Sequence, residues 1–132
     1  MTVVLDTSAV TAVVFGESDA EMFLSVMLSN AGDLQMSAGT AVELGIVVEA
    51  RQGAEATKDL GILVDRLGMA TVAVDRVQAE AAVAAWRRFG KGRHPAGLNL
   101  GDCFSYALAK LTGAPLLFKG RDFAQTDIPS AL

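Results

Sequence analysis

The stretch TVVLDTSAVTAVVFG, residues 2–16, decides the fold, because a short β-rich run leads directly into an acidic residue and a helical pattern. TVVL predicts a strand over 2–5, and SAVTAVVFG predicts a helix over 8–16. Further strands are expected at LQM (34–36), TVAV (71–74) and PLLF (115–118). Short strands that alternate with longer helices are typical of a parallel α/β sheet, which is the fold class we predict.

Five more helical patterns separate these strands. They cover residues 18–32, 37–53, 54–68, 75–90 and 101–113. Ser18 is the expected N-cap of the first of them, and glycines end both members of the pair after the second strand. No repeat or linker divides the chain, so residues 1–132 are predicted to form a single domain.

Composition limits the classes of function. The chain has 132 residues, 52% of them apolar, which suffices for one hydrophobic core. A single cysteine excludes an internal disulfide, and no Cys/His cluster has zinc-type spacing. No apolar run approaches the roughly 18 residues of a membrane span, so we expect a cytoplasmic protein without membrane association. The net charge of −4 argues against a broad basic surface, but RRFGKGRH (87–94) is a local basic run.

Four carboxylates occupy positions where a parallel sheet gathers its functional groups, beyond the carboxyl ends of the strands. Asp6 follows the first strand, and Asp122 comes after the last one. Glu43 lies on a small and apolar helix face, and Asp102 is in the first turn of its helix. Each has a structural alternative, as helix cap, helix-start residue or turn residue. Asp75 also follows a predicted strand, and spacing alone does not separate a site role from helix capping.

Repulsion decides what a cluster of these acids requires. Two carboxylates about 5 Å apart repel by roughly 3 kcal/mol at an effective dielectric constant of about 20. Three or four ionised together therefore need a cation, and oxygen-only ligands favour Mg²⁺ or Mn²⁺ over zinc. Such a site suits phosphoryl chemistry.

Four motifs resemble the PIN-domain ribonucleases, in particular the VapC toxins of toxin-antitoxin pairs: VVLDTSAVTAVV, SAGTAVELGIVVEAR, RRFGKGRHPAGLNLGDCFSYALAK and PLLFKGRDFAQTDI. The resemblance implies a three-layer α/β/α fold around a central parallel sheet of four or five strands. It also implies a Mg²⁺- or Mn²⁺-dependent endoribonuclease that leaves a 5′-phosphate and a 3′-hydroxyl.

The same resemblance implies roles for individual residues. The catalytic, metal-binding acids are Asp6, Glu43, Asp102 and Asp122. Many relatives carry another acid where this chain has Gly120, and Asp127 is expected to supplement the site instead. The hydroxyls of Thr7 and Ser8 are expected to orient the first aspartate or a water, with helix capping as the alternative for Ser8.

Partners and substrate contacts are also implied. The expected phosphate contacts are Arg87, Arg88, Lys91, Arg93 and Lys119. Trp86 and Tyr106 are the aromatic residues expected to stack on bases. The alternative for Trp86 is a position in the core or in a dimer interface. The resemblance implies a homodimer and a VapB-type antitoxin. The apolar residues expected to supply the antitoxin surface, unless they pack in the core, are Met22, Phe23, Val26, Met27 and Leu63.

Two other functions remain open on the sequence. An aspartate after the first strand and Lys119 after the last also occur in phosphotransfer and phosphatase domains, although the paired aspartates of those sites are missing. The second open function is that of a non-catalytic PIN-like binding module. Cys103 has no histidine or basic neighbour in sequence to lower its pKa, so we expect it to be buried and inert.

Overall fold

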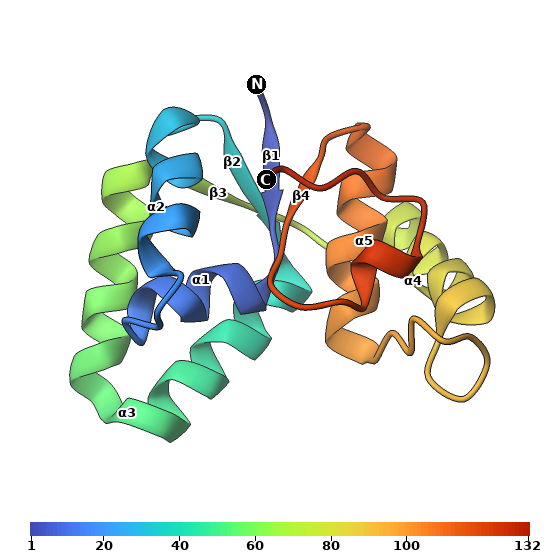
Figure 1. Ribbon diagram of the computed structural model, residues 1–132, viewed down its shortest axis with the longest axis horizontal. Helices are drawn as coiled ribbons and strands as arrows, with labels where there is room; N and C mark the ends of the chain where they lie inside the picture. The colour runs from blue at the N-terminus through green and yellow to red at the C-terminus, as the bar shows by residue number, and fades with distance from the viewer.

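A parallel sheet of four strands lies between two groups of helices in the computed structural model, which describes residues 1–132 (Figure 1). The elements follow in the order β1 (Val3–Leu5), α1 (Thr7–Val14), α2 (Ala20–Ser29), β2 (Leu34–Ser37), α3 (Ala38–Leu67), β3 (Met69–Val72), α4 (Arg76–Phe89), α5 (Leu100–Thr112), β4 (Leu116–Leu117) and the 3₁₀ turn η1 (Phe123–Gln125). None of the helices combines the length and apolar character that a membrane crossing requires.

The strand order is β3-β2-β1-β4, and every pair is parallel. β1 therefore lies inside the sheet, with the chain winding from it to β2 and β3 on one side and to β4 on the other. In sheets of this kind the crevice beyond the carboxyl end of the strand where the winding reverses is the usual ligand site. The predicted parallel sheet is confirmed, with four strands, and Asp6 follows its pivotal strand.

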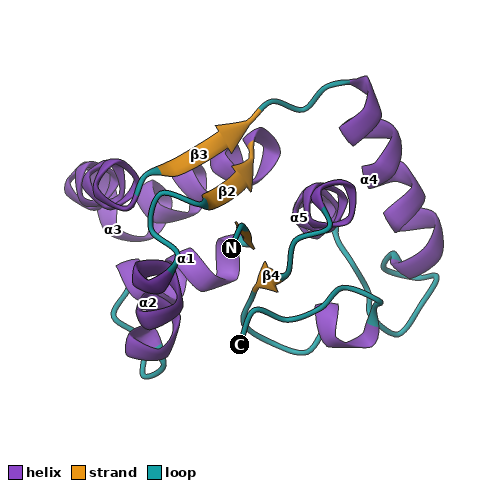
Figure 2. Cartoon of the chain, turned by 90° about the horizontal axis from the view of Figure 1, so that it is seen from above, coloured by secondary structure: helices purple, strands orange, loops and turns teal.

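Alternating residues of β1 face two separate cores. Val3 and Leu5 belong to a core with α1, α2 and α3, whereas Val4 belongs to one with α4 and α5. Figure 2 shows these two groups of helices on opposite faces of the sheet. The side-chain period of two in a strand thus produces the three-layer α/β/α architecture.

The third strand lies two residues earlier than the predicted 71–74. Gly68 ends α3 in the left-handed conformation (φ 61°), and the chain enters β3 at Met69, pairing in register with all of β2. Asp75 consequently lies beyond the strand end, where its carboxylate accepts the Gln78 N–H at 2.8 Å. Helix capping is therefore the role the structure gives Asp75.

The expected pair of helices after β2 is confirmed within α3. Its two helical segments meet at a kink at Gly53, whose φ of 82° is not helical, so the first helix ends at the predicted glycine. Ser18 is not the N-cap of α2, because the helix begins one residue later, after Asp19.

Candidate metal and nuclease site

Asp6 is the most tightly held of the predicted acids. It is the N-cap of α1, directly after β1, and only 4% of its surface is exposed. Its Oδ2 accepts the backbone N–H of Ser8 at 3.1 Å and the Ser8 hydroxyl at 2.6 Å. Its Oδ1 accepts the hydroxyl of Ser105 at 2.6 Å. Both carboxylate oxygens are therefore fixed. Asp6 itself caps α1, and Ser8 lies inside the helix and orients the aspartate.

Asp102 lies at the start of α5, as predicted, and completes a capping box with Asn99. The Asn99 N–H donates to Asp102 Oδ2 at 3.1 Å, and the Asp102 N–H donates to Asn99 Oδ1 at 2.9 Å. Burial raises the pKa of Asp102 to about 7 against the hydrogen bond from Asn99, and the charges of Asp6, Asp122 and Glu43 raise it further. Asp6, Glu43 and Asp122 therefore all act electrostatically on Asp102, and we call these four residues the acid cluster.

Glu43 reaches the acid cluster from the second turn of α3. The Thr7 hydroxyl donates to its Oε1 at 2.5 Å. Its Oε2 lies so close to Gly101 that a Cβ added there would stand 2.0 Å from this oxygen. The glycine before Asp102 is therefore what lets the glutamate lie against the start of α5.

Asp122 is the exposed member of the acid cluster. It follows β4 immediately before η1, and its side chain makes no capping hydrogen bond. Its effect on the pKa of Asp102 places it near the other acids. A carboxylate without a protein partner remains available to bind an ion or to accept a proton.

The donor set of the acid cluster fits Mg²⁺ or Mn²⁺ in its chemistry. All the candidate ligand atoms are carboxylate oxygens, which these cations prefer. Burial is the main cause of the raised pKa of Asp102, and the charges of Asp6, Asp122 and Glu43 raise it further, so a bound cation would favour its ionised form. No three acidic, imidazole or thiol side chains are already grouped around one point. The acid cluster is therefore not a complete ligand sphere in this structure, and its carboxylates would have to move closer together to hold a cation.

Asp127 is engaged elsewhere. Its carboxylate accepts hydrogen bonds from Lys110 at 2.8 Å and from the Tyr106 hydroxyl at 2.5 Å, and it pairs with Arg88 at 3.3 Å. The bonds from Lys110 and Tyr106 lower the pKa of Asp127 to about 2. Tyr106 is itself buried, so it does not present its ring to a base. Asp127 and Arg88 are therefore paired with each other, away from the acid cluster.

The predicted phosphate contacts differ in availability. The Lys119 ammonium is paired with Glu17 at 3.2 Å and Asp19 at 3.1 Å, while its backbone N–H donates to the Ser8 hydroxyl. Arg93 lies over the Trp86 ring, 4.7 Å from its centroid. Lys91 and Arg87 are exposed and form no ion pair, so they are the basic side chains most free to meet a polyanion.

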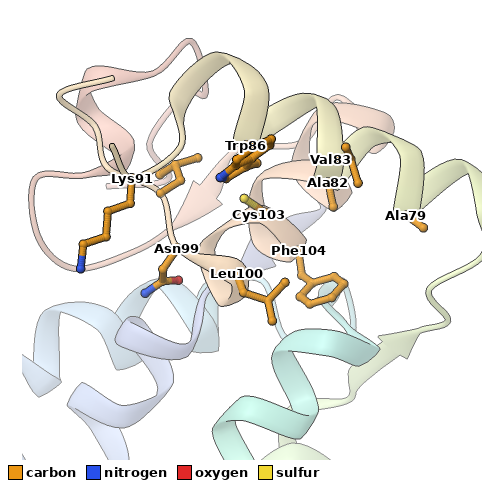
Figure 3. Close-up of a pocket in the computed structure, with 10 residues that line it drawn as sticks. Ala79, Ala82, Val83, Trp86, Lys91, Asn99, Leu100, Cys103 and Phe104 are labelled. Atoms are coloured by element: carbon orange, nitrogen blue, oxygen red, sulfur yellow. The ribbon is translucent and has the colours of Figure 1, made fainter. Parts of the chain in front are cut away.

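An apolar hollow of about 480 Å³ adjoins the acid cluster between α4 and the start of α5 (Figure 3). Trp86 and Val83 line it from α4, and Leu100 and Phe104 line it from α5, with Lys91 at its edge. Trp86 is 45% exposed, so its ring does not lie in the core.

Two further residues can now be placed. Cys103 is buried on the floor of the hollow, as predicted, and burial raises the pKa of its thiol to about 11, which disfavours the reactive thiolate. His94 accepts the Ala96 N–H through Nδ1 and packs edge-on against Phe89, so it supports a loop and lies outside the acid cluster.

Sequence reasoning missed the side chains that hold the acids in place. Ser105 donates to Asp6, Thr40 contacts Ser105 at 3.2 Å, and Gly101 makes room for Glu43. The helical spacing of Ser105 and Asp102 shows a shared face, but the partner of that hydroxyl lies 99 residues away.

Comparisons with known proteins agree with this geometry. A model of the PIN domain family matches residues 3–129. The chain is 50% identical over 125 residues to a ribonuclease VapC of Mycolicibacterium smegmatis, covering 95% of this chain and 96% of that protein. It is 50% identical to ribonuclease VapC30 of Mycobacterium tuberculosis, covering 95% of both chains, and 46% identical to its ribonuclease VapC42, covering 97% and 98%. Among solved structures, the sarcin-ricin loop cleaving toxin VapC20 of Mycobacterium tuberculosis matches the fold with a TM-score of 0.79 at 16% identity, covering 96% of both chains.

Proposed function

This chain belongs to the PIN-domain family, and from that premise we propose that it is a Mg²⁺- or Mn²⁺-dependent endoribonuclease toxin of the VapC type. The observation that carries the proposal is that Asp6, Glu43 and Asp122, from three distant parts of the sequence, all act electrostatically on Asp102. The curated relatives at 46% to 50% identity are ribonucleases by name and align over nearly the whole chain.

Asp6, Glu43, Asp102 and Asp122 would hold the cation. When bound, it supplies neutralisation of the phosphate charge and a lowered pKa of the attacking water. The chain's own residues fix the geometry, since Ser8 and Ser105 hold Asp6, and Thr7 holds Glu43. A carboxylate of the acid cluster accepts the proton of the attacking water. The water oxygen bonds to phosphorus, the bond to the 3′ oxygen breaks, and that oxygen takes up a proton, leaving a 5′-phosphate and a 3′-hydroxyl.

RNA would approach over the start of α5 and the loop before it. Lys91 and Arg87 are free to contact phosphates there, and Arg93 adds its charge beside the exposed ring of Trp86. Phosphate contacts of this kind position a nucleic acid without reading its sequence. They also allow a protein of net charge −4 to draw a polyanion toward one edge.

Cleavage of RNA with and without Mn²⁺ tests the proposal. Asp6→Asn and Asp102→Asn should each abolish cleavage, whereas Asp127→Asn should retain it, because Asp127 is paired outside the acid cluster. Cleavage that survives Asp6→Asn, or that proceeds unchanged after removal of divalent ions, would contradict the mechanism. An intact chain that binds an antitoxin but never cleaves RNA would favour a binding module.

The proposed antitoxin surface is an apolar hollow between α2 and the second half of α3. Leu24 and Leu28 line it from α2, and Ile62 and Leu63 line it from α3. Leu28 and Ile62 are exposed, as an amphipathic segment of a VapB-type antitoxin would need. Of the residues expected to supply such a surface, Phe23 and Met27 lie instead in the core, Val26 and Leu63 are half-buried, and Met22 is exposed. Co-purification with the antitoxin, and its loss in a Leu28→Asp/Ile62→Asp variant, would test this surface.

We place the proposed homodimer on the apolar side chains beside the acid cluster. Val42 and Ile46 of α3, Leu100 and Phe104 of α5 and Trp86 of α4 border two adjoining hollows. Val42, Ile46 and Leu100 are 64%, 65% and 77% exposed, which is unusual for large apolar side chains. Sedimentation of the chain alone should give a dimer that Ile46→Asp/Leu100→Asp converts to a monomer, whereas a monomeric parent chain would contradict this placement.

A further inference from the structure

A chain of buried hydroxyl groups lies behind the acid cluster. The Ser105 hydroxyl donates to Asp6 Oδ1 at 2.6 Å, and the Thr40 hydroxyl lies 3.2 Å from that of Ser105. Ser105 and Thr40 are both fully buried, and Asp6 is 4% exposed. The three residues belong to α5, the first turn of α3 and the end of β1, so the chain joins the elements that carry Asp102, Glu43 and Asp6.

The direction of the hydrogen bonds follows from the groups involved. An ionised carboxylate can only accept, so the single hydroxyl proton of Ser105 is directed to Asp6. Thr40 must then donate to Ser105, since either atom of that contact can be the donor. Bonds to an ionised acceptor are shorter and stronger than neutral ones, which agrees with 2.6 Å for the bond to Asp6.

The two ends of the Asp6 carboxylate are held by different elements. Ser8 holds only Oδ2, through its N–H and its hydroxyl. A carboxylate held at one oxygen can still rotate about its Cβ–Cγ bond, because that torsion is soft. Ser105 holds Oδ1 from α5 and thereby fixes the plane of the carboxylate relative to the helix that carries Asp102.

We propose that Ser105, oriented by Thr40, is a positioning residue that fixes the carboxylate plane of Asp6 for cation binding. This inference rests on the proposed function and deepens it. Ser105 acts through Asp6 and touches neither RNA nor the reacting atoms. Groups that orient a metal ligand typically change metal affinity by about 10- to 100-fold when they are removed.

Manganese binding to the full-length chain, measured by titration calorimetry, tests the inference without relying on activity. Ser105→Ala should weaken Mn²⁺ binding by about 10- to 100-fold. Thr40→Val keeps the shape of the side chain and removes only the hydroxyl, so it should weaken binding in the same direction by a smaller factor. RNA cleavage by Ser105→Ala should recover most of its rate at saturating Mn²⁺, because the residue sets affinity and orientation and takes no part in the bond changes.

Two control variants remove hydroxyls that lie outside the chain. Thr112→Val alters a hydroxyl of α5 that bonds only backbone carbonyls, and Ser25→Ala alters an exposed serine of α2. Both should bind Mn²⁺ as the parent chain does. If Ser105→Ala does not fold, Ser105→Cys keeps the volume with a weak donor and should show the same loss of affinity.

The outcomes separate this inference from the proposed function. Parent-like Mn²⁺ affinity in folded Ser105→Ala or Ser105→Cys, with binding abolished by Asp6→Asn, would overturn the positioning role and leave the nuclease proposal intact. A parent chain that binds no Mn²⁺ at millimolar concentration would overturn both.

Discussion

Replacing Asp102 with asparagine should stabilise the metal-free protein while abolishing its activity. The asparagine side chain removes one negative charge from the acid cluster but keeps an oxygen that can accept the Asn99 N–H, so the capping box of α5 survives. The loss of charge removes the cost of burying an ionised carboxylate, which is the main cause of the raised pKa of Asp102, and also relieves the repulsion from Asp6, Asp122 and Glu43.

The magnitude follows from the pKa. For Asp102 it is about 7 in the folded protein against 3.8 for a free aspartate. The difference is about 3, which at about 1.36 kcal/mol per pH unit corresponds to about 4 kcal/mol. Solvent screening at this half-buried position lowers the expected effect to about 2 kcal/mol. Because the folded-state pKa is raised, the protonated form stabilises the fold below pH 3.8, and this contribution is lost as the pH rises through about 7.

Urea unfolding in the presence of a chelator measures this effect directly. At pH 3 the parent chain and Asp102→Asn should have similar free energies of unfolding, the difference should grow as the pH rises from 3.8 to about 7, and at pH 8 the variant should be more stable by about 2 kcal/mol. All other titrating groups are common to both proteins, so the difference isolates Asp102. Mn²⁺ should raise the stability of the parent chain at pH 8 and leave the variant unchanged. A difference in unfolding free energy between the two proteins that is the same at pH 3 and at pH 8 would refute the reasoning.

Three further changes probe the surroundings of the acid cluster. Gly101→Ala places a Cβ 2.0 Å from Glu43 Oε2, so we expect cleavage to fall about 100-fold with an unchanged far-ultraviolet circular dichroism spectrum. Asp127→Asn should cleave RNA at the parent rate yet lose about 1 kcal/mol of stability at pH 7. That loss should disappear as the pH falls toward 2. The pKa of Asp127 is lowered from 3.8 to about 2, so its ionised form stabilises the fold above pH 3.8, and this stabilisation is lost as the pH falls through about 2. Lys91→Ala should raise the KM for RNA and reduce its salt dependence by about one ion, whereas Lys119→Ala, whose ammonium is already paired, should leave KM unchanged.

Local sequence patterns were enough to predict two of the four acids together with their positions in the fold. Asp6 follows a buried strand and Asp102 lies in the first turn of an apolar helix, and a few neighbouring residues are enough to recognise each of these features. The third strand was placed two residues late because β3 lies at the edge of the sheet, and its exposed Ala70 and Thr71 give no apolar signal.

Long-range partners explain what the sequence could not show. Ser105 and Asp6 are 99 residues apart, and Asp127 meets Arg88 across 39 residues. Only the folded chain shows that the contact between Ser105 and Asp6 supports the acid cluster. The contact between Arg88 and Asp127 instead pairs these two residues with each other, away from the cluster. Sequence position favoured Asp122 over Asp127, but nothing local to Asp127 shows that Lys110, Tyr106 and Arg88 engage its carboxylate.

The helix ends of the fold relieve only part of the repulsion in the acid cluster. Asp6 caps α1 and Asp102 lies in the first turn of α5, where the helix dipole favours a carboxylate by about 0.3 to 1 kcal/mol. Two carboxylates about 5 Å apart repel by roughly 3 kcal/mol, so the dipoles cannot balance even one pair. Glu43 lies beyond the first turn of α3, and η1 is too short to help Asp122. Three hydrogen bonds satisfy Asp6, but only one reaches the half-buried carboxylate of Asp102, so the ionised form of Asp102 has the most to gain from a bound cation.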